Sequence, residues 1–305
     1  MSSRRKEMTR KDFLRTSCAG LTGLLAPKAL KGQSPDSRGR DKRPLPTRLL
    51  GRTGIRTPPL GFGASRTMEP SLLAAALDKG MTFIDTGRSY FNGNNERMVG
   101  DVVKGRRKDV IIQSKMKVNV RKDGSAAETA VALRRAMESA FAASLKALQT
   151  DYIDLMLIHD AGRPEVLTNE TVMEFFAAAK KSGRIRAHGF SCHDEIDILH
   201  AANASGFWDI IMTPFNHKGS YVHSISKSSR EWDQPRVISE LEKAHAASLG
   251  VVVMKTCSGG PYAPPGADRP TFGAAIRWVL DHPFVGVAAV AMADVEEMAE
   301  DLKAL

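Results

Sequence analysis

Eight short apolar segments, regularly spaced and separated by helical patterns, constrain the fold of this chain more than any other feature. A Gly-rich opening at 58–63 is followed by seven segments rich in β-branched residues, at 82–86, 110–115, 152–159, 186–191, 209–215, 251–256 and 285–291. Their length and composition are typical of buried strands. Successive segments start roughly 25–40 residues apart, which is the length of a strand plus a returning helix.

Helical patterns fill the intervals between these segments. Residues 70–79 place Leu72, Leu73, Ala76 and Leu77 on one face, which is typical of an amphipathic helix. Longer or similar patterns run over 127–148, 170–182, 236–248 and 272–281. Strands that alternate with helices at this spacing are expected to be parallel.

The number of units decides between two α/β architectures. Eight strand–helix units within about 255 residues fit a (β/α)8 TIM barrel. An open, doubly wound sheet is the alternative, but no GxGxxG motif follows any of the strand segments. We therefore predict an α/β fold of the TIM-barrel type.

The charge of the chain is concentrated at its N-terminus. Of 44 lysines and arginines, 13 lie in the first 50 positions, whereas only 4 of the 34 acidic residues do. The remainder is nearly neutral, which argues against a nucleic-acid surface on the folded domain. Cys18, Cys192 and Cys257 are far apart and form no CxxC pair, so we expect neither a metal site nor a disulfide.

Residues 1–30 have the pattern of a targeting segment. A basic stretch precedes a mildly apolar run that is too short, and too broken by Pro27 and Lys28, to be a stable membrane span. The stretch 9–15, TRKDFLR, resembles a twin-arginine (Tat) signal with Lys11 in place of the second arginine. A disordered basic tail is the alternative.

The leader implies a three-part organisation. We expect a signal peptide at 1–30, a polar, Pro-rich linker at 31–47 and the barrel at 48–305. If the leader functions, the Tat export machinery is a partner and the protein is periplasmic or otherwise extracytoplasmic. Otherwise it is cytoplasmic.

Polar residues end four of the apolar segments. Asp85, Lys115, His159 and Ser191 stand at or near the carboxyl ends of the second to fifth segments. In a parallel barrel these ends share one rim, where barrel enzymes carry their active sites. Because a buried charge needs a partner, Asp85 and Lys115 are expected to pair.

Tyr90 lies five residues after Asp85 and can fold over the same rim. Beside a cationic Lys115, its phenol is expected to have a lowered pKa and to give a proton to a carbonyl oxygen. A neutral His159 would donate a hydrogen bond to that oxygen. A hydride must then come from a cofactor.

Four blocks of sequence together resemble the aldo/keto reductase family over nearly all of 48–303. The match lies in LGRTG at 50–54 with LGFG at 60–63, GMTFIDT at 80–86 with Tyr90, Asn95-Glu96 and Gly100, LQTDYIDL at 148–155 through His159, and GRIR at 183–186 with GFS at 189–191. The resemblance implies a (β/α)8 barrel that reduces an aldehyde or ketone with NADP or NAD, or runs the reverse reaction.

The resemblance also assigns site residues. Asp85, Tyr90, Lys115 and His159 occupy the positions of the family's catalytic tetrad. Ser191 would contact the nicotinamide carboxamide, and Met254, if it is not simply core, would pack on the nicotinamide ring. The full set implied to bind the cofactor is Gly63, Ser191, Cys192, Met212, Met254, Lys255, Thr256, Ser258, Asp294, Glu297 and Asp301.

The sequence departs from the family in three places. Cys192 and Met212 stand where the family usually has the Asn and Gln that bind the carboxamide. No Arg or Lys stands at Ala293, and Asp294 and Asp301 would repel a 2′-phosphate, so we expect a weakened NADP preference and use of NAD. The chain ends at Leu305, and neither a C-terminal substrate loop nor an iron–sulfur cysteine cluster is expected.

Two other functions compete with the reductase. One is a nicotinamide-binding redox sensor or regulatory subunit with little turnover, and the other is a barrel lyase that uses Lys115 as a Schiff-base nucleophile. We interpret His188, His193 and His217 as surface or loop residues, and Tyr221 and Trp232 as either pocket walls or loop anchors. Substrate identity is not predicted, because barrel loops vary freely.

Overall fold

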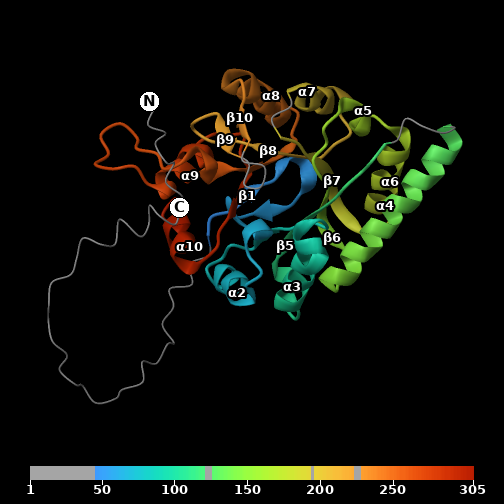
Figure 1. The fold of residues 1–305 in the computed structure, drawn as a ribbon, viewed down its shortest axis with the longest axis horizontal. Helices are drawn as coiled ribbons and strands as arrows, with labels where there is room; N and C mark the ends of the chain where they lie inside the picture. The colour runs from blue at the N-terminus through green and yellow to red at the C-terminus, as the bar shows by residue number, and fades with distance from the viewer. Residues whose placement is uncertain (1–44, 121–125, 194–195, 223–227) are drawn as a thin grey trace, which may run out of the picture.

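The computed structural model describes residues 45–120, 126–193, 196–222 and 228–305. Eight parallel strands form a closed barrel, in the order β3-β4-β5-β6-β7-β8-β11-β12. Figure 1 shows the helices arranged around these strands. The predicted TIM barrel is therefore confirmed, and the open sheet is wrong. The predicted signal peptide and nearly all of the linker lie outside the described residues.

Each predicted strand segment overlaps one barrel strand, with differences of a few residues at the ends. The strands are β3 (Leu60–Gly63), β4 (Phe83–Asp85), β5 (Ile111–Met116), β6 (Ile153–Ile158), β7 (Ile185–Ser191), β8 (Ile210–Pro214), β11 (Gly250–Met254) and β12 (Val287–Ala291). The helices are α2 (Pro70–Asp78), α3 (Asn94–Val103), α4 (Ala126–Leu148), α5 (Pro164–Leu167), α6 (Glu170–Lys181), α7 (Ile196–Ser205), α8 (Gln234–Ala246), α9 (Phe272–Leu280) and α10 (Val295–Leu302).

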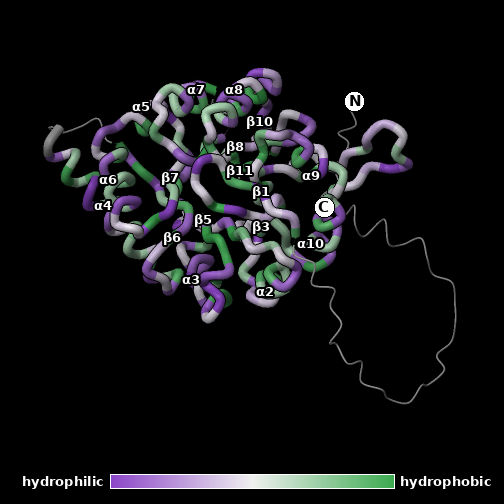
Figure 2. Tube along the Cα trace, turned by 180° about the vertical axis from the view of Figure 1, so that it is seen from behind, coloured by the Kyte–Doolittle hydropathy of each residue, from purple (hydrophilic) through white to green (hydrophobic). Residues whose placement is uncertain are grey.

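Side chains alternate between two hydrophobic layers, because successive residues of a strand point to opposite faces. On β6, Leu155 and Leu157 belong to the cluster inside the barrel. Met156 and Ile158 belong to the larger cluster between the strands and the helices. Figure 2 shows hydrophobic residues along the central strands and hydrophilic ones over much of the outer helical layer.

A short hairpin closes the amino-terminal end of the barrel. It pairs β1 (Arg48–Leu49) with β2 (Arg56–Thr57) in antiparallel fashion. Leu50 and Ile55, from the turn between these strands, are fully buried in the inner cluster. A Cβ atom added at Gly250 would lie 2.8 Å from Leu50 Cγ, so the plug fits closely. The carboxyl end is left to form a site.

A second hairpin, β9 (Ser220–Val222) with β10 (Ser229–Glu231), follows β8 and was not predicted. Tyr221 of β9 is buried, whereas Trp232 is only partly buried and packs against the outer core. Among the described residues, no helix combines the length and the apolar composition that crossing a bilayer requires.

Candidate active site

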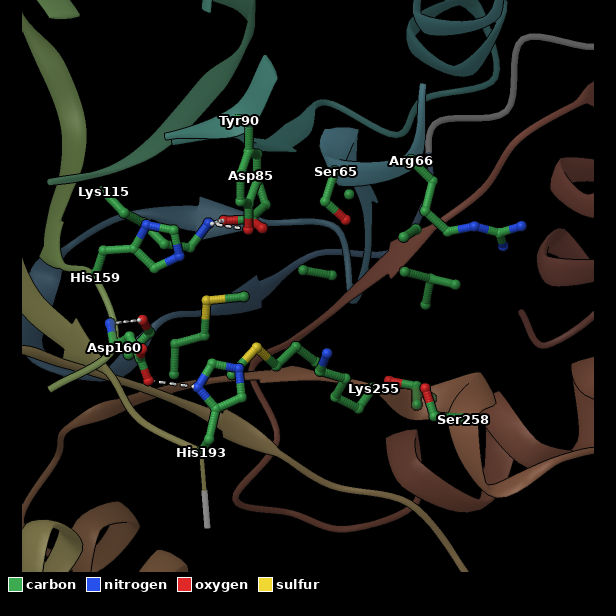
Figure 3. Close-up of a pocket in the computed structure, with 18 of the residues that line it drawn as sticks. Ser65, Arg66, Asp85, Tyr90, Lys115, His159, Asp160, His193, Lys255 and Ser258 are labelled. Atoms are coloured by element: carbon green, nitrogen blue, oxygen red, sulfur yellow. Dashed lines mark hydrogen bonds and ion pairs between the residues drawn. The ribbon is translucent and has the colours of Figure 1, made fainter. Parts of the chain in front are cut away.

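The alternation of the strands directs the site residues to the inside of the barrel. Phe83 on β4 and Ile111 on β5 lie in the inner cluster. Counting by two from each brings Asp85 and Lys115 to the same inner face. Figure 3 shows the pocket at the carboxyl end, with Asp85, Tyr90, Lys115 and His159 grouped on one side of it. The structure therefore brings the four predicted side chains together.

Lys115 is the centre of this group. Its Nζ lies 2.6 Å from Asp85 Oδ1 and donates hydrogen bonds to the Thr86 carbonyl at 2.7 Å and to Tyr90 Oη at 3.1 Å. An ammonium has three N–H donors, so these three partners use all of them. Because Lys115 donates to the phenol oxygen, the phenol keeps its own O–H to donate elsewhere.

Gln113 is a partner of Asp85 that the sequence did not predict. It precedes Lys115 by two residues on β5, and its Nε2 donates to Asp85 Oδ1 at 2.6 Å. Gln113 is fully buried. The carboxylate is therefore held from two directions, which fixes the position of Lys115.

The loop that carries Tyr90 is fixed by the residues that follow it. Asn95 Nδ2 donates to the carbonyls of Ala64 and Thr67, each at 3.0 Å. Ser114 Oγ donates to Glu96 Oε1 at 2.6 Å, and Glu96 also pairs with Arg88. Asn95 and Glu96 are fully buried. They anchor the segment between Asp85 and α3 and hence the position of the phenol.

The pKa of Tyr90 differs from the expectation. Burial raises the pKa of the phenol, Lys115 lowers it and Asp85 raises it, and the net effect is a raised pKa. The expected lowering is therefore wrong, because the desolvation of the phenolate outweighs the nearby ammonium. Burial alone would lower the pKa of Lys115, but Asp85 and Tyr90 outweigh burial and raise it.

His159 is a neutral imidazole in this setting. Burial lowers its pKa to about 3, with further lowering by Lys115 and Lys117. Its Nδ1 lies 2.9 Å from Ser89 Oγ, and its ring meets the Tyr90 ring edge-on at 5.6 Å between centroids. If the Ser89 hydroxyl donates to Nδ1, Nε2 carries the ring proton and can donate to a substrate oxygen.

A cavity of about 730 Å³ extends from these four residues across the barrel mouth. The tetrad, Gly63, Ser191, Met212, Met254, Lys255, Thr256 and Ser258 all line it. Thr256 Oγ1 is buried and has no hydrogen-bond partner among the described residues. Burial lowers the pKa of Lys255, whose ammonium lies 4.8 Å from the centroid of the Tyr221 ring.

Four of the predicted cofactor residues do not line this cavity. Cys192 follows Ser191 and is therefore directed outward, and it is fully buried in the cluster between strands and helices. Asp301 is also fully buried, so it cannot face a 2′-phosphate as expected. Asp294 caps α10 by accepting from the Glu297 N–H at 2.9 Å.

Glu297 is the fourth of these residues, and its surroundings identify a cation that the sequence did not. Its carboxylate accepts from the Ala293 N–H at 2.9 Å and pairs with Arg66 at 3.2 Å. Arg66 follows β3 and lines the cavity on the side away from Lys115 and His159 (Figure 3). The only sequence signal for Arg66 is its position three residues after Gly63, at the end of the Gly-rich opening.

The histidine interpretations have mixed outcomes. His188 is not a surface residue: it is buried, stacks on Phe207 at 4.5 Å and meets Trp208 edge-on. Burial lowers its pKa to about 4. His193 lines the cavity and bonds Asp160 through Nδ1 at 2.7 Å. The described residues hold no group of three or more His, Cys, Asp or Glu side chains placed to bind a metal ion.

The comparison with protein families agrees with this geometry. The chain belongs to the Aldo/keto reductase family, whose sequence profile matches residues 63–260. The matched region runs from Gly63, at the end of β3, to the loop after β11, and it contains the whole tetrad.

Curated relatives match about half of the chain. The chain is 34% identical over 150 residues to the uncharacterized oxidoreductase YqkF of Bacillus subtilis, covering 49% of this chain and 48% of the relative. It is 34% identical over 140 residues to the methylglyoxal reductase YeaE of Escherichia coli, covering 46% and 44%. A probable voltage-gated potassium channel subunit beta of Oryza sativa is 31% identical over 136 residues, covering 40% and 39%. The matched stretch thus spans less than half the length of each of these relatives.

Solved structures match more of the chain at lower identity. The holo form of an aldo-keto reductase from Bacillus halodurans has a TM-score of 0.68 at 22% identity and covers 85% of this chain and 90% of that one. An aldo-keto reductase from Klebsiella pneumoniae, in complex with NADPH, has a TM-score of 0.59 at 21% identity and covers 82% and 86%. At these identities the likeness establishes the shared barrel.

Proposed function

We propose that the protein reduces an aldehyde or ketone to an alcohol, or runs the reverse reaction, with a nicotinamide cofactor. The observation that carries the proposal is the fully engaged Lys115, which lies 2.6 Å from Asp85 and 3.1 Å from Tyr90 Oη at the edge of the cavity. A buried ammonium aimed at a phenol is an arrangement for proton transfer. We likewise propose Asp85, Tyr90, Lys115 and His159 as its catalytic residues.

The cavity residues fit a nicotinamide cofactor. The cavity volume of about 730 Å³ lies within the range of small-molecule sites. The buried, unpartnered Thr256 hydroxyl needs a partner that a polar ligand would provide. Lys255 and Ser258 would bind its phosphates, and Met212 and Met254 would contact the ring. When bound, this cofactor supplies the hydride.

The protein's own residues then handle the proton. The raised pKa of Tyr90 keeps the phenol protonated at neutral pH, ready to donate to a carbonyl oxygen as that oxygen gains negative charge. Lys115 stabilises the phenolate that remains, because its ammonium already points at Tyr90 Oη. Neutral His159 orients the same carbonyl oxygen by a hydrogen bond from Nε2.

Removal of one oxygen tests this assignment. Tyr90→Phe keeps the ring and should lower kcat for propanal reduction by about 10²–10⁴, the usual contribution of general acid catalysis, with an unchanged cofactor Kd. Tyr152→Phe is the matched control, because Tyr152 precedes β6 at the opposite end of the barrel and stacks on Arg107. Equal activity of the two variants would refute the assignment.

For the choice of cofactor, we propose that NADH is accepted alongside NADPH. The support is that Arg66, the cation on the far side of the cavity, is already paired with the buried Glu297. A 2′-phosphate would compete with that carboxylate for the guanidinium. Fluorescence titration should give Kd values within tenfold of each other, and Glu297→Gln should favour NADPH. If the unaltered protein binds NADPH at least tenfold more tightly than NADH, the proposed use of both cofactors is refuted.

A low-turnover redox sensor is the second candidate. It is supported by the match to the plant protein described as a probable voltage-gated potassium channel subunit beta. Cofactor binding without turnover of any aldehyde in a broad panel would favour it. The lyase candidate is disfavoured, because a Schiff base needs a neutral amine and the pKa of Lys115 is raised.

For the leader, we propose a signal peptide at 1–30, a linker at 31–47 and export of the folded barrel, 48–305, by the Tat machinery. The support is the TRKDFLR stretch and the concentration of basic residues before position 50. Cell fractionation should find the protein in the periplasm and the Arg10→Gln, Lys11→Gln double variant in the cytoplasm. A wild-type protein confined to the cytoplasm would refute export.

A further inference from the structure

A second polar cluster lines the cavity beside the tetrad. Asp160 Oδ1 lies 2.7 Å from His193 Nδ1, and Asp160 Oδ2 lies 2.9 Å from Lys117 Nζ. All three residues line the same cavity as Tyr90. Figure 3 shows Asp160 and His193 on the side of the pocket opposite Tyr90 and Asp85. The mechanism of hydride and proton transfer uses none of them.

The backbone turns in order to place Asp160 here. His159 and Asp160 are neighbours, and neighbours in an extended strand point to opposite sides. Asp160 instead has a left-handed φ of 62°, a conformation that Asp adopts more readily than most residues. Its N–H donates to Ser191 Oγ at 2.9 Å, which holds the turn. Two successive side chains therefore face one cavity.

The ionisation of Asp160 determines what the cluster can bind. The hydrogen bond from His193 lowers the pKa of the carboxyl group well below its usual range, Lys117 lowers it further, and both outweigh burial. The ionised carboxylate accepts only, so His193 Nδ1 must carry a proton. A carboxylate offers about four acceptor positions, which leaves room for hydroxyl donors beside His193 and Lys117.

The charges of the cluster favour a neutral ligand. The ammonium of Lys117 offsets the carboxylate of Asp160 at 2.9 Å, so the pair presents donors and acceptors more than a net field. A hydroxyl group can both donate to the carboxylate and accept from the ammonium. A carboxylate-bearing ligand cannot donate to Asp160 and would have to compete with it for Lys117.

We propose that the substrate is a hydroxylated aldehyde or ketone whose hydroxyl groups, on carbons near the carbonyl, are bound by Asp160, Lys117 and His193. This inference rests on the proposed reductase function. A hydrogen bond to a charged group changes binding by about tenfold to a hundredfold. The Asp160 side chain is 41% exposed and already partnered, so a substrate without hydroxyls leaves no buried group unsatisfied. The lower value, about tenfold, is therefore expected rather than the roughly 10⁴ of fully buried sites.

The test compares kcat/KM for glyceraldehyde and propanal in the wild type and in Asp160→Asn. Asn has the same size and also tolerates the left-handed conformation. A neighbouring hydroxyl makes any carbonyl more reactive, so the informative quantity is the change in the glyceraldehyde-to-propanal ratio on substitution. Any effect of the Asp160 substitution on His159 changes kcat/KM for both substrates and therefore cancels in the ratio. We expect the ratio to fall about tenfold in Asp160→Asn and severalfold in Lys117→Met.

The control variant is Glu174→Gln, which breaks an exposed ion pair between Glu174 and Arg134 on the outer helices. It should leave the ratio unchanged. A ratio that stays constant in both Asp160→Asn and Lys117→Met would overturn the proposal, and so would a preference for succinic semialdehyde over both glyceraldehyde and butanal. If the wild type reduces propanal in a Tyr90-dependent way, such results refute only this inference. If it reduces no aldehyde, the proposed function fails together with it.

Discussion

Replacing Asp85 with Asn tests the ion pair at the centre of the site. The substitution keeps the shape of the side chain but removes the charge that lies 2.6 Å from Lys115 Nζ. The fully buried ammonium would keep only neutral partners, namely Thr86 O, Tyr90 Oη and the amide oxygen of the new side chain. Burial alone lowers the pKa of this lysine, and a buried lysine without a counter-ion titrates several units below its ordinary value. We therefore expect Lys115 to be neutral in the folded variant.

The free energy follows from the ordinary pKa of 10.5 for a lysine in the unfolded chain. Removing that proton at pH 7 costs about 5 kcal/mol, at about 1.4 kcal/mol per pH unit. At pH 9 the cost is about 2 kcal/mol. Because the unfolded chain binds one more proton than the folded variant, the stability of the variant rises with pH over this range. Lys115 of the wild type is protonated in both states and contributes no such slope.

The measurement is urea unfolding of the wild type and Asp85→Asn at pH 7, 8 and 9, followed by the fluorescence of the buried Trp208. The stability deficit should narrow by about 3 kcal/mol between pH 7 and pH 9. A deficit that is equal at both pH values would refute the reasoning, because the lysine would then have stayed charged. Asp78→Asn, which breaks an exposed pair with Arg106, should change stability by less than about 1 kcal/mol at every pH.

Three further predictions concern single contacts. The Ser89 hydroxyl lies 2.9 Å from His159 Nδ1 and fixes the tautomer of the imidazole. Ser89→Ala should therefore lower kcat about tenfold with little change in KM, and Ser89→Thr should keep the wild-type kcat. Equal kcat values of the two variants in steady-state kinetics would contradict this role. Thr256→Val should weaken cofactor binding about fivefold without lowering the stability of the free protein, because it removes a buried, unpartnered hydroxyl; fluorescence titration and urea unfolding measure the two effects. His188 has a pKa of about 4 in the folded state, so it should destabilise the protein as the pH falls from 7 to 5, by about 2 kcal/mol. His188→Leu should lose that much less stability over the same range, and an equal loss would be the contrary result.

The strands were predictable because parallel barrel strands are buried on both sides and form continuous apolar runs. The helices were predictable where they are long and amphipathic, as in α4. By contrast, α3 opens with Asn94, Asn95, Glu96 and Arg97, a composition that resembles a loop. Its first turn is polar because Asn95 and Glu96 hold the tyrosine loop from inside the protein. That contact depends on tertiary structure and leaves no periodic pattern in the sequence.

The pKa of Tyr90 shows a different limit of prediction. The sequence identified the neighbouring ammonium correctly but could not give the degree of burial, and burial has the larger effect. The same applies to His188, whose place between Phe176, Phe207 and Trp208 became visible only in the folded barrel. In neither case could the sequence give the extent of burial around the titrating group.

The alternation of side chains along a strand tells which residues face the inside of the barrel, and it needs only the sequence and the strand positions. It bears on the placement of Gln113 and Cys192. Counting by two from Lys115 reaches Gln113 on the inner face, where it contacts Asp85. The same count from Ser191 excludes Cys192, which is directed to the outer layer. The rule fails two residues past the end of β6, where the left-handed Asp160 returns to the inside. Alternation therefore tells which strand residues face the interior of the barrel, whereas the residues proposed to select the substrate depend on loop torsion angles that the sequence does not determine.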